Sequence, residues 1–388
     1  MREAIKHSMP AVIVGGGLNA LGIVRSLGSQ DVPLLVIGTD SRSPAMRSRY
    51  GKKLVVPSLE GTDFIERLLD AGKDISGPAV LFLTEEKTVI TVSEHRGAVS
   101  GKFLIRLPEH ERLMALMQKE GFQKLAEAIH APVPKTVRLQ GLTDLPQLEH
   151  LTYPCVLKPN VKDYTYGARF KKAYKVASAT EAAELYRQIE PVLADMVVQE
   201  WIEGSDAEIY FCLQYIGAHG ERISSFTGRK IRSWPLRVGG TASCTAAWDF
   251  HEELSDMTHA FFNRVGFSGM GSMEYKRDER DGRFYMVEPT VARTDFQEEV
   301  ATVNGVNIPL AAYRHETGLP PVRSQPEKVP TMWRDPLSDR WAFKEGNKMP
   351  DERSRLHKVC DAYWRWSDPL PWVDVMANMV ALRLGRGR

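Results

Sequence analysis

Cysteine is scarce in this chain of 388 residues, and its four cysteines lie far apart without a CxxC pair. This spacing argues against a zinc site, and a chain of this length does not need a disulfide framework. We therefore expect reduced, mostly buried thiols and a cytoplasmic protein. The N-terminal residues also lack a long apolar run followed by a small-residue cleavage site, so no signal peptide is expected.

Long apolar runs and an excess of one charge are missing as well. No stretch approaches the ~20 consecutive apolar residues of a membrane span. The net charge is +2 and the basic residues are spread along the chain, which argues against a general nucleic-acid binder with its concentrated basic surface. Hydrophobic residues make up 43% and charged residues 26%, as in globular proteins, and the length indicates two or three packed units.

Short apolar runs alternate with helical patterns in the first third of the chain. Strands are predicted at Ala11–Val14, Pro33–Ile37 and Ala79–Leu83, and helical patterns run up to Leu27 and over Phe64–Asp70. Strand–helix–strand alternation predicts a parallel, doubly wound α/β sheet. We expect this unit to end near residue 105.

A glycine-rich turn follows the first strand. Gly15, Gly17 and Ala20 fit the pattern G-x-G-x-x-A, and Asp40 ends the next strand. This context is typical of NAD or FAD binding in a Rossmann-type oxidoreductase. Two alternatives stay open: the glycines allow a tight turn, or the helix N-terminus at Asn19 binds another anion, such as a substrate carboxylate. The rest of the chain argues against a dinucleotide, because it carries phosphate-binding candidates of its own.

The later parts of the chain change character twice. Pro108–His130 reads as helical and ends at Pro132, and strand and hairpin patterns then run from Cys155 to Glu288. From about residue 320 the chain is rich in Pro, Trp and charge, which indicates an appended element that ends in a helix over Trp372–Leu384.

The C-terminal helix carries apolar residues at helical spacing and ends in Arg383, Arg386 and Arg388. A basic amphipathic helix can lie on an anionic membrane. Packing of this helix on its own domain is the favoured interpretation, so membrane contact is the minority alternative.

Two basic features are candidates for phosphate binding. Lys158 ends an apolar strand, where its ammonium can pair with a phosphate as a compact charge; a surface lysine fits the segment equally well. Arg229, Lys230 and Arg232 place three cations within four residues. A solvated charge run is the common meaning of such a cluster, but its position in the chain also fits a phosphate or acyl-phosphate clamp.

The segment Val197–Gly204, which contains Gln199 and Glu200, runs from a strand into a turn. Such a segment can offer backbone amide and carbonyl groups to an adenine edge, and Asp206 or Glu208 can then accept hydrogen bonds from ribose hydroxyls. An ordinary strand–turn–strand is the alternative interpretation.

Two carboxylates, Glu274 and Glu288, lie in apolar segments on either side of a charged loop that contains the turn pair Asp281-Gly282. A hairpin would bring the two acids onto neighbouring strands. Inward-facing carboxylates are costly unless they are paired or bind a metal, and magnesium prefers such oxygen ligands together with nucleotide phosphates. A pair of exposed acids on a hairpin is the alternative.

Taken in order, these segments resemble the ATP-grasp superfamily, and among its members the carboxylate–amine ligases, which include D-aspartate ligases and pyrrolysine-pathway ligases. The resemblance covers roughly residues 10 to 318. It implies a Rossmann-like pre-ATP-grasp domain over residues 1–105, a small lobe over 106–190, a large lobe with the metal site over 191–320, and a C-terminal helical element over 321–388.

The resemblance also assigns the nucleotide residues. The segment Pro132–Thr136 matches a family motif that follows the first phosphate-binding lysine, which is Lys119 here, with Lys124 as the alternative. The loop 163–168 stands where the family has a mobile glycine-rich loop, although only Gly167 remains. By the same resemblance the second phosphate lysine is Lys158, the adenine contacts are Glu200 and Ile202 beside Gln199, and the ribose contact is Asp206 or Glu208.

For the metal, the resemblance implies Mg²⁺, with Mn²⁺ as a substitute, held by Glu274 and Glu288. Thr290 replaces the asparagine that family members carry as a further ligand, and Arg293 comes one residue late. Arg293, assisted by Lys230 or Arg232, is expected to steady the acyl phosphate.

The activity implied by the resemblance is ATP-dependent joining of a small-molecule carboxylate to an amine through an acyl phosphate. Asn19 and the segment Thr84-Glu85-Glu86 are candidates for acceptor binding or, equally, for turn and cap roles. Two rivals stay open: the oxidoreductase, and an ATP-binding scaffold without turnover. The sequence does not define the oligomeric state, and a homodimer is compatible with it.

Overall fold

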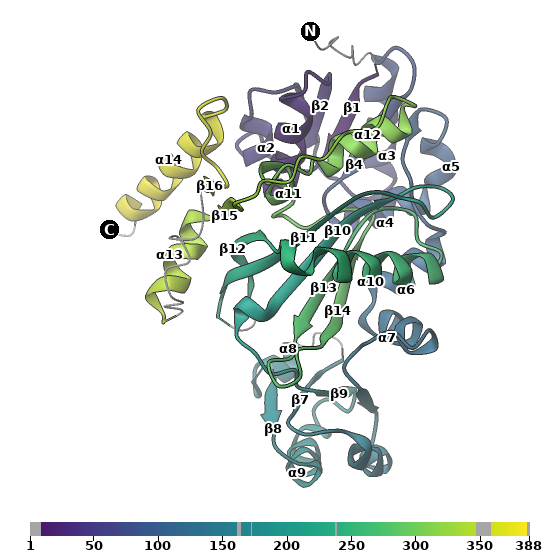
Figure 1. The fold of residues 1–388 in the computed structure, drawn as a ribbon, viewed down its shortest axis with the longest axis vertical. Coiled ribbons are helices and arrows are strands. Elements are labelled where there is room, and N and C mark those ends of the chain that lie inside the picture. The colour runs from purple at the N-terminus through teal and green to yellow at the C-terminus, as the bar shows by residue number, and fades with distance from the viewer. Residues whose placement is uncertain (1–8, 161–163, 172, 237–238, 347–357, 386–388) are drawn as a thin grey trace. The chain divides into compact units, whose positions relative to one another are not determined.

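The computed structural model describes residues 9–160, 164–171, 173–236, 239–346 and 358–385 (Figure 1). The chain forms two compact units. The larger unit comprises Met1–Met117, Ser205–Glu274 and Pro289–Arg388, and the smaller unit comprises Gln118–Gly204 and Tyr275–Glu288. The division into four domains drawn from the sequence stays a prediction.

The first sheet of the larger unit is parallel and has the strand order β3-β2-β1-β4-β5. This finding confirms the predicted doubly wound sheet. Helical segments connect its strands. The elements are β1 (Ala11–Val14), α1 (Leu18–Gly28), β2 (Leu34–Gly38), α2 (Pro44–Arg47), β3 (Lys52–Val55), α3 (Gly61–Lys73), β4 (Ala79–Leu83), α4 (Glu86–Glu94), α5 (Arg96–Val99) and β5 (Phe103–Leu104).

The glycine turn after β1 has a packing explanation. Gly15 adopts φ +132°, and a Cβ built on it would lie 1.9 Å from Oγ1 of Thr84. The Thr84 hydroxyl in turn donates to the carbonyl of Val14 at 2.8 Å. A side chain at position 15 would therefore break the junction between β1 and the end of β4, so glycine is required there without any dinucleotide.

The second sheet of the larger unit has seven strands in the order β14-β13-β10-β11-β12-β15-β16. Helix α10 packs on β10 and β11. The elements are β10 (Ile209–Ile216), β11 (Arg222–Trp234), β12 (Gly240–Ala246), α10 (His251–Arg264), β13 (Gly269–Arg277), β14 (Phe284–Val291), α11 (Glu299–Val303) and α12 (Ile308–Glu316).

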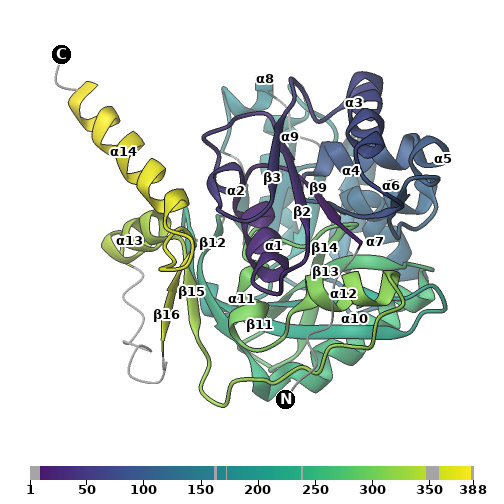
Figure 2. The ribbon, with the colours of Figure 1, turned by 90° about the horizontal axis from the view of Figure 1, so that it is seen from above.

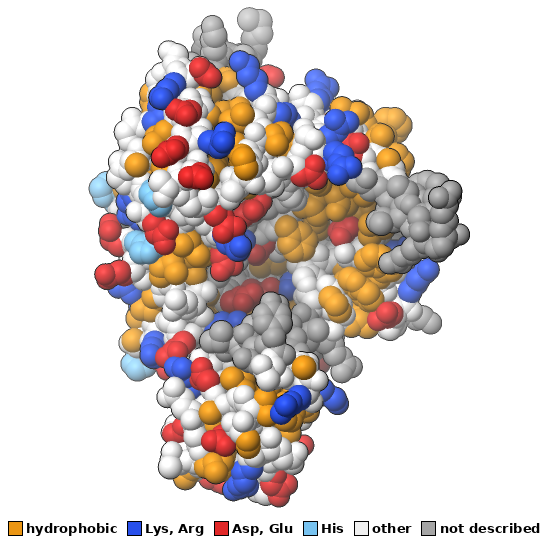
Figure 3. Space-filling model, turned by 180° about the vertical axis from the view of Figure 1, so that it is seen from behind, with side chains coloured by type: hydrophobic (Ala, Val, Ile, Leu, Met, Phe, Trp, Pro, Cys, Tyr) orange, Lys and Arg blue, Asp and Glu red, His pale blue; other side chains and the backbone are white. Residues whose placement is uncertain are grey.

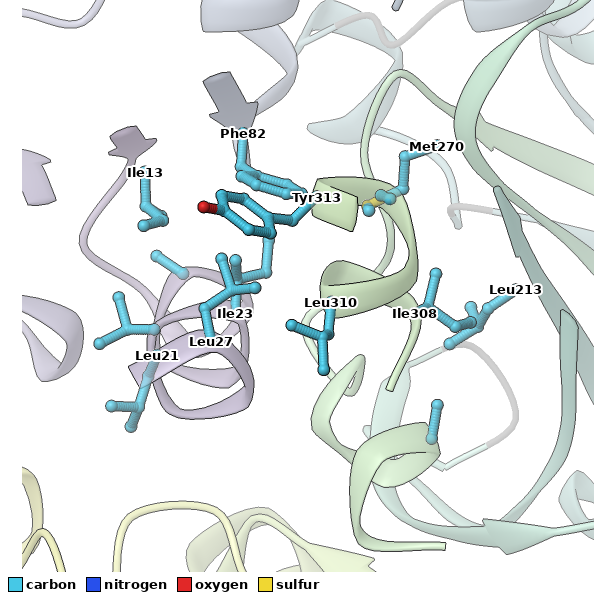
Figure 4. Close-up of a cluster of buried hydrophobic side chains, with 14 of the residues drawn as sticks. Ile13, Leu21, Ile23, Leu27, Phe82, Leu213, Met270, Ile308, Leu310 and Tyr313 are labelled. Carbon is cyan, nitrogen blue, oxygen red and sulfur yellow. The ribbon is translucent and has the colours of Figure 1, made fainter. Parts of the chain in front are cut away.

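A single hydrophobic core joins the two sheets of the larger unit. Leu310 and Tyr313 of α12 lie between Leu27 of α1 on one side and Leu213 and Met270 of the seven-stranded sheet on the other (Figure 4). The face of the large sheet that carries Leu213 and Met270 is therefore the face turned toward α11 and α12.

The C-terminal residues are integrated into the larger unit. Strand β15 (Met332–Arg334) pairs antiparallel with β12, and β16 (Val359–Asp361) pairs parallel with β15. Between them lies α13 (Pro336–Lys344), and α14 (Leu370–Gly385) follows. The predicted appended element thus completes the edge of the sheet.

Helix α14 packs on α2, where Asp374 pairs with Arg47, while its far end extends beyond the sheets (Figure 2). This packing agrees with the favoured interpretation of the C-terminal helix. Arg386 and Arg388 lie outside the described residues, as does the side chain of Arg383. Within the described residues, no helix has the length and apolar character needed to cross a membrane.

The smaller unit is built on a four-stranded antiparallel sheet in the order β6-β9-β7-β8. Helix α9 is capped at its N-terminus: the Ser178 hydroxyl accepts from the amide of Glu181, and the Glu181 carboxylate accepts from the amide of Ala177. The elements are α7 (Lys119–Ala128), β6 (Thr136–Leu139), β7 (Cys155–Pro159), α8 (Tyr164–Gly167), β8 (Tyr174–Val176), α9 (Ala179–Ile189) and β9 (Met196–Glu200).

Two elements differ from the sequence-based expectation. The helix expected over Pro108–His130 is broken at Gln118 into α6 (His110–Met117) and α7, because the two halves bury their apolar faces in different units. Strand β8 begins at Tyr174 rather than at Phe170, where the sequence pattern places its start, and the ring of Phe170 instead stacks on Tyr166 at 5.4 Å.

Candidate functional site

One face of the large sheet carries polar side chains beyond the end of the hydrophobic core. Along β13, Met270, Ser272 and Glu274 alternate with residues of the other face. Met270 lies in the core with α12. Because strand side chains repeat with a period of two, Ser272 and Glu274 point to the same face as Met270. The core-facing side of the sheet thus becomes polar toward Glu274.

Lys230 of β11 reaches this polar region. Its ammonium lies 2.7 Å from the Glu274 carboxylate, and the two side chains are 6% and 24% exposed. A lysine so deeply buried needs an anionic partner or ligand to offset its lost hydration. The pair therefore fixes a cation and a carboxylate side by side.

Asp295, which follows β14, links the two strands of the hairpin. Its Oδ1 accepts from the Thr290 hydroxyl at 2.9 Å, and its Oδ2 accepts from the Ser272 hydroxyl at 3.1 Å. Thr290 therefore points to the same face as Ser272. Glu288 precedes Thr290 by two residues on β14, so strand alternation gives it that face as well. Glu274, Glu288 and Thr290 were predicted from the sequence, whereas Asp295 and Ser272 were not.

Arg293 stands in a loop whose backbone is held from the first sheet. Its guanidinium lies 4.0 Å from Glu86 at the start of α4. Asn19 is buried and donates to the carbonyl of Thr294 at 2.5 Å and to that of Thr84 at 3.5 Å. Asn19 thus holds the backbone of the Arg293 loop, and acceptor binding by Asn19 and the segment after β4 stays a prediction.

Arg232 does not share the position of Lys230. The register of β11 against β12 shifts between the two residues, as at a β-bulge. The Arg232 guanidinium pairs with Asp339 of α13 at 2.6 Å, and the side chains are 7% and 4% exposed. The ring of Phe343 covers the same guanidinium. The structure therefore places Arg232 against the C-terminal residues and Lys230 beside Glu274.

In the smaller unit, Lys158 lies in a chain of polar contacts. Its ammonium donates to Oε1 of Gln199 at 3.0 Å, and the Gln199 amide donates to the Thr136 hydroxyl at 2.9 Å. The three residues come from β7, β9 and β6 and share one face of the sheet. Lys158 is thus a half-buried, oriented ammonium and not a surface lysine.

The end of β9 is held through its backbone. The amide of Glu200 donates to Lys135 and the amide of Trp201 donates to Pro154, both at 2.9 Å, while the Glu200 carboxylate accepts from the amide of Thr152. Ile202 is the first residue after these hydrogen-bonded amides. This arrangement fixes the path of the segment on which an adenine edge would have to dock.

The remaining candidates lie where the chain passes from one unit to the other. Lys119 is the exposed first residue of α7, next to the crossing at Gln118. Asp206 is buried, and it begins the short 3-10 helix Asp206–Glu208 just after the crossing at Gly204. Glu274 and Glu288 end the segments at the other two crossings.

The donor set of the hairpin suits a hard cation. Glu274, Glu288 and Thr290 offer carboxylate and hydroxyl oxygens, and Lys230 adds a positive charge that suits phosphate oxygens. Magnesium is commonly bound by one or two carboxylates together with substrate phosphates. The residues present therefore fit magnesium bound with a nucleotide, and a manganese ion suits the same ligands.

The four cysteines are free. Burial raises the pKa of the Cys212 and Cys244 thiols, which keeps them protonated and unreactive. On the face shown in Figure 3, basic and acidic side chains are interspersed without a concentrated basic region. These observations agree with the expectations from composition.

Comparison with known proteins was made at the level of sequence and of fold. No protein-family model matches the chain. A D-aspartate ligase of Enterococcus faecium (strain Aus0004) is 23% identical over 317 residues, which cover 76% of this chain and 74% of that protein.

Two solved structures share the fold at low sequence identity. An N5-carboxyaminoimidazole synthetase from Staphylococcus aureus has a TM-score of 0.64 at 13% identity and covers 90% of this chain and 88% of its own. The biotin carboxylase domain of a 2-oxoglutarate carboxylase from Hydrogenobacter thermophilus, a dimer solved with MgADP, has a TM-score of 0.59 at 14% identity and covers 84% and 74%. The comparisons confirm the predicted fold class and the resemblance to ATP-grasp carboxylate–amine ligases.

Proposed function

We propose that this chain, which has the ATP-grasp fold, is an ATP-dependent ligase that activates a carboxylate as an acyl phosphate and joins it to an amine. The observation that carries the proposal is the buried Lys230–Glu274 pair, which shares one sheet face with Thr290 and its partner Asp295. A cation beside an oxygen donor set suits a metal–nucleotide complex, and the exposed Glu288, two residues before Thr290 on β14, offers a second carboxylate.

The contacts to the nucleotide are proposed residue by residue. Lys119 and Lys158 are the proposed phosphate contacts, because an ammonium offers a compact charge to phosphate oxygens. Gln199 orients Lys158. For adenine we propose Glu200 and the backbone of Ile202, and for ribose Asp206 or Glu208.

Glu274, Glu288 and Thr290 are the proposed ligands of Mg²⁺. A magnesium ion held by these residues would supply positive charge that neutralises the charge developing during phosphoryl transfer. Lys230 holds the Glu274 carboxylate in place through the 2.7 Å contact.

The reaction has two steps. A carboxylate oxygen of the substrate attacks the γ-phosphorus of ATP, the bond to ADP breaks, and an acyl phosphate forms. The amine nitrogen then attacks the acyl carbon, phosphate leaves with the former carboxylate oxygen, and the nitrogen loses a proton. Arg293 and Lys230 are proposed to stabilise the negative charge of the transferred group. We propose that Arg232 acts as a positioning residue through its ion pair with Asp339.

The substrates are proposed as classes. The similar D-aspartate ligase makes an amino acid such as D-aspartate the first carboxylate to test, against amino-acid, peptide and sugar amines. The free cysteines favour a reducing compartment such as the cytoplasm. A homodimer is compatible with the dimeric biotin carboxylase neighbour.

The test is release of ADP and phosphate with Mg²⁺ and ATP across a panel of carboxylates and amines. The Glu288→Ala variant is measured beside the unmodified protein. Release that requires both a carboxylate and Glu288 supports the ligase. ATP binding without release from any pair favours the ATP-binding scaffold instead, and NAD binding without ATP binding favours the oxidoreductase.

A further inference from the structure

Thr290 stands where the resembling ligases carry an asparagine, and this exchange changes the chemistry of the donor. An asparagine side chain presents a carbonyl oxygen, which carries no proton. A threonine hydroxyl has one proton on the same oxygen that would face a cation. A freely rotating hydroxyl can therefore turn its proton toward the metal and weaken binding.

Asp295 removes this freedom. The Thr290 hydroxyl donates to Oδ1 of Asp295 at 2.9 Å, and the second carboxylate oxygen accepts from Ser272 at 3.1 Å. Both oxygens of Asp295 are thus used, one toward each strand of the hairpin, and the carboxylate plane is fixed. Because the hydroxyl proton of Thr290 is directed at Asp295, the lone pairs of the Thr290 oxygen point away from Asp295 and can face a cation.

We propose that Asp295 is a positioning residue that orients the Thr290 hydroxyl as a cation ligand, so that the Thr290–Asp295 pair replaces the asparagine. This inference rests on the proposed function, because it concerns the same metal. Hydrogen-bond partners of metal ligands commonly tune affinity in this way, and their loss costs about 10–100-fold in metal affinity. Asp295 acts through Thr290 and needs no contact with the metal.

The experiment is a double-mutant cycle on Mn²⁺ binding. Binding of Mn²⁺ to the protein–ADP complex is followed by the electron paramagnetic resonance of the free ion, which needs no turnover. The proteins are the unmodified chain, Asp295→Ala, which has no acceptor for the Thr290 hydroxyl, Thr290→Val and the double variant. We expect each single variant to weaken Mn²⁺ binding about 10–100-fold, and the double variant to equal Thr290→Val alone.

Two further variants separate positioning from folding. Thr290→Asn supplies a proton-free oxygen and should restore the affinity that Thr290→Val loses. Asp335→Asn is the matched control, because Asp335 also accepts from a hydroxyl, that of Ser338 at 2.6 Å, but at the start of α13. It should leave Mn²⁺ affinity unchanged. The thermal unfolding midpoint of each variant without ligand reports on the fold.

Additive losses in the double variant would overturn the inference, since Asp295 would then act independently of Thr290. An unchanged affinity in Asp295→Ala would overturn it too. Neither result affects the proposed function as long as the unmodified chain binds Mn²⁺ with ADP. Failure of the unmodified chain to bind Mn²⁺ with ADP would contradict the proposed function and the inference together.

Discussion

Lys230 and Glu274, from strands that are not adjacent in the sheet, meet at 2.7 Å with the lysine almost fully buried. A pair with so deeply buried a lysine does not by itself stabilise the fold, because the lost hydration offsets much of the attraction between the two charges. The pair lies on the same sheet face as Ser272, which donates to Asp295, and this placement fits the phosphate and metal binding proposed for that face.

Replacing this lysine tests that interpretation. Lys230→Met keeps much of the side-chain volume but removes the ammonium, and we expect kcat/KM to fall about 10²–10³-fold, the scale of losing one preorganised donor. Steady-state kinetics with ATP as the varied substrate provide the measurement. The control is Arg229→Met, whose side chain points to the other face of β11 and should affect kcat/KM far less. Equal losses in the two variants would argue for a merely structural lysine.

Lys158 carries the corresponding prediction in the smaller unit. Lys158→Ala is expected to cost about 2–4 kcal/mol of transition-state stabilisation, because the ammonium held by Gln199 would no longer meet a phosphate. Lys175→Ala is the matched control, since Lys175 lies on the neighbouring strand β8 and pairs with Glu203. Near-normal ATP turnover in a folded Lys158→Ala protein would refute the assignment.

Glu298 predicts an unusual pH dependence of stability. It is fully buried, and within the described part of the chain both carboxylate oxygens lack a hydrogen-bond partner. Burial, and then the neighbouring Glu299 charge, raises the pKa of Glu298 well above 4.5. The native state therefore keeps a proton that the unfolded chain releases, so this contribution to stability is complete below about pH 4.5 and is lost as the pH rises toward the native pKa.

The matched variant is Glu298→Gln, which cannot titrate. Its free energy of unfolding relative to the unmodified chain should rise with pH, with a limiting slope of about 1.4 kcal/mol per pH unit. Denaturant unfolding between about pH 5 and pH 8 measures it. A difference that stays constant over this range would contradict the raised pKa.

Asp368 predicts that the C-terminal residues are needed for stability. Its carboxylate is fully buried and accepts from Arg25 at 2.9 Å, from the Ser48 hydroxyl at 2.9 Å and from the Arg49 amide at 2.8 Å. Asp368→Ala should cost about 3–5 kcal/mol in the free energy of unfolding, because Arg25 loses the nearer of its two buried acidic partners, and the Ser48 hydroxyl and the Arg49 amide lose their acceptor.

The control for Asp368 is Asp374→Ala on the same segment. Asp374 pairs with the partly exposed Arg47, and such pairs contribute about 1 kcal/mol or less. Chemical denaturation distinguishes the two. A decrease in the free energy of unfolding smaller than that of Asp374→Ala would show that Asp368 does not hold the C-terminal residues in place.

The sequence was most informative where a local pattern defines the element. The apolar runs at Ala11–Val14 and Ala79–Leu83 predicted buried parallel strands, and both are confirmed. The acids Glu274 and Glu288 could be placed on neighbouring strands because the charged loop between them reads as a turn.

The partners of these acids could not be found in this way. Asp295 lies in an irregular loop after β14, and its contact with Ser272 spans 23 residues of sequence. The pairing of Arg232 with Asp339 spans 107 residues. No periodic pattern links such positions, since tertiary packing alone decides which distant side chains meet. The break at Gln118 was missed for the same reason: helix periodicity does not show which unit each half joins.

The central claim is that the carboxylate is activated by phosphoryl transfer. The most direct measurement uses a substrate carboxylate labelled with ¹⁸O, together with ATP, Mg²⁺ and the amine that supports turnover. We predict that one labelled oxygen appears in the released phosphate for each amide formed, and that the nucleotide product is ADP. Phosphate free of label, or label in AMP, would contradict the acyl-phosphate mechanism.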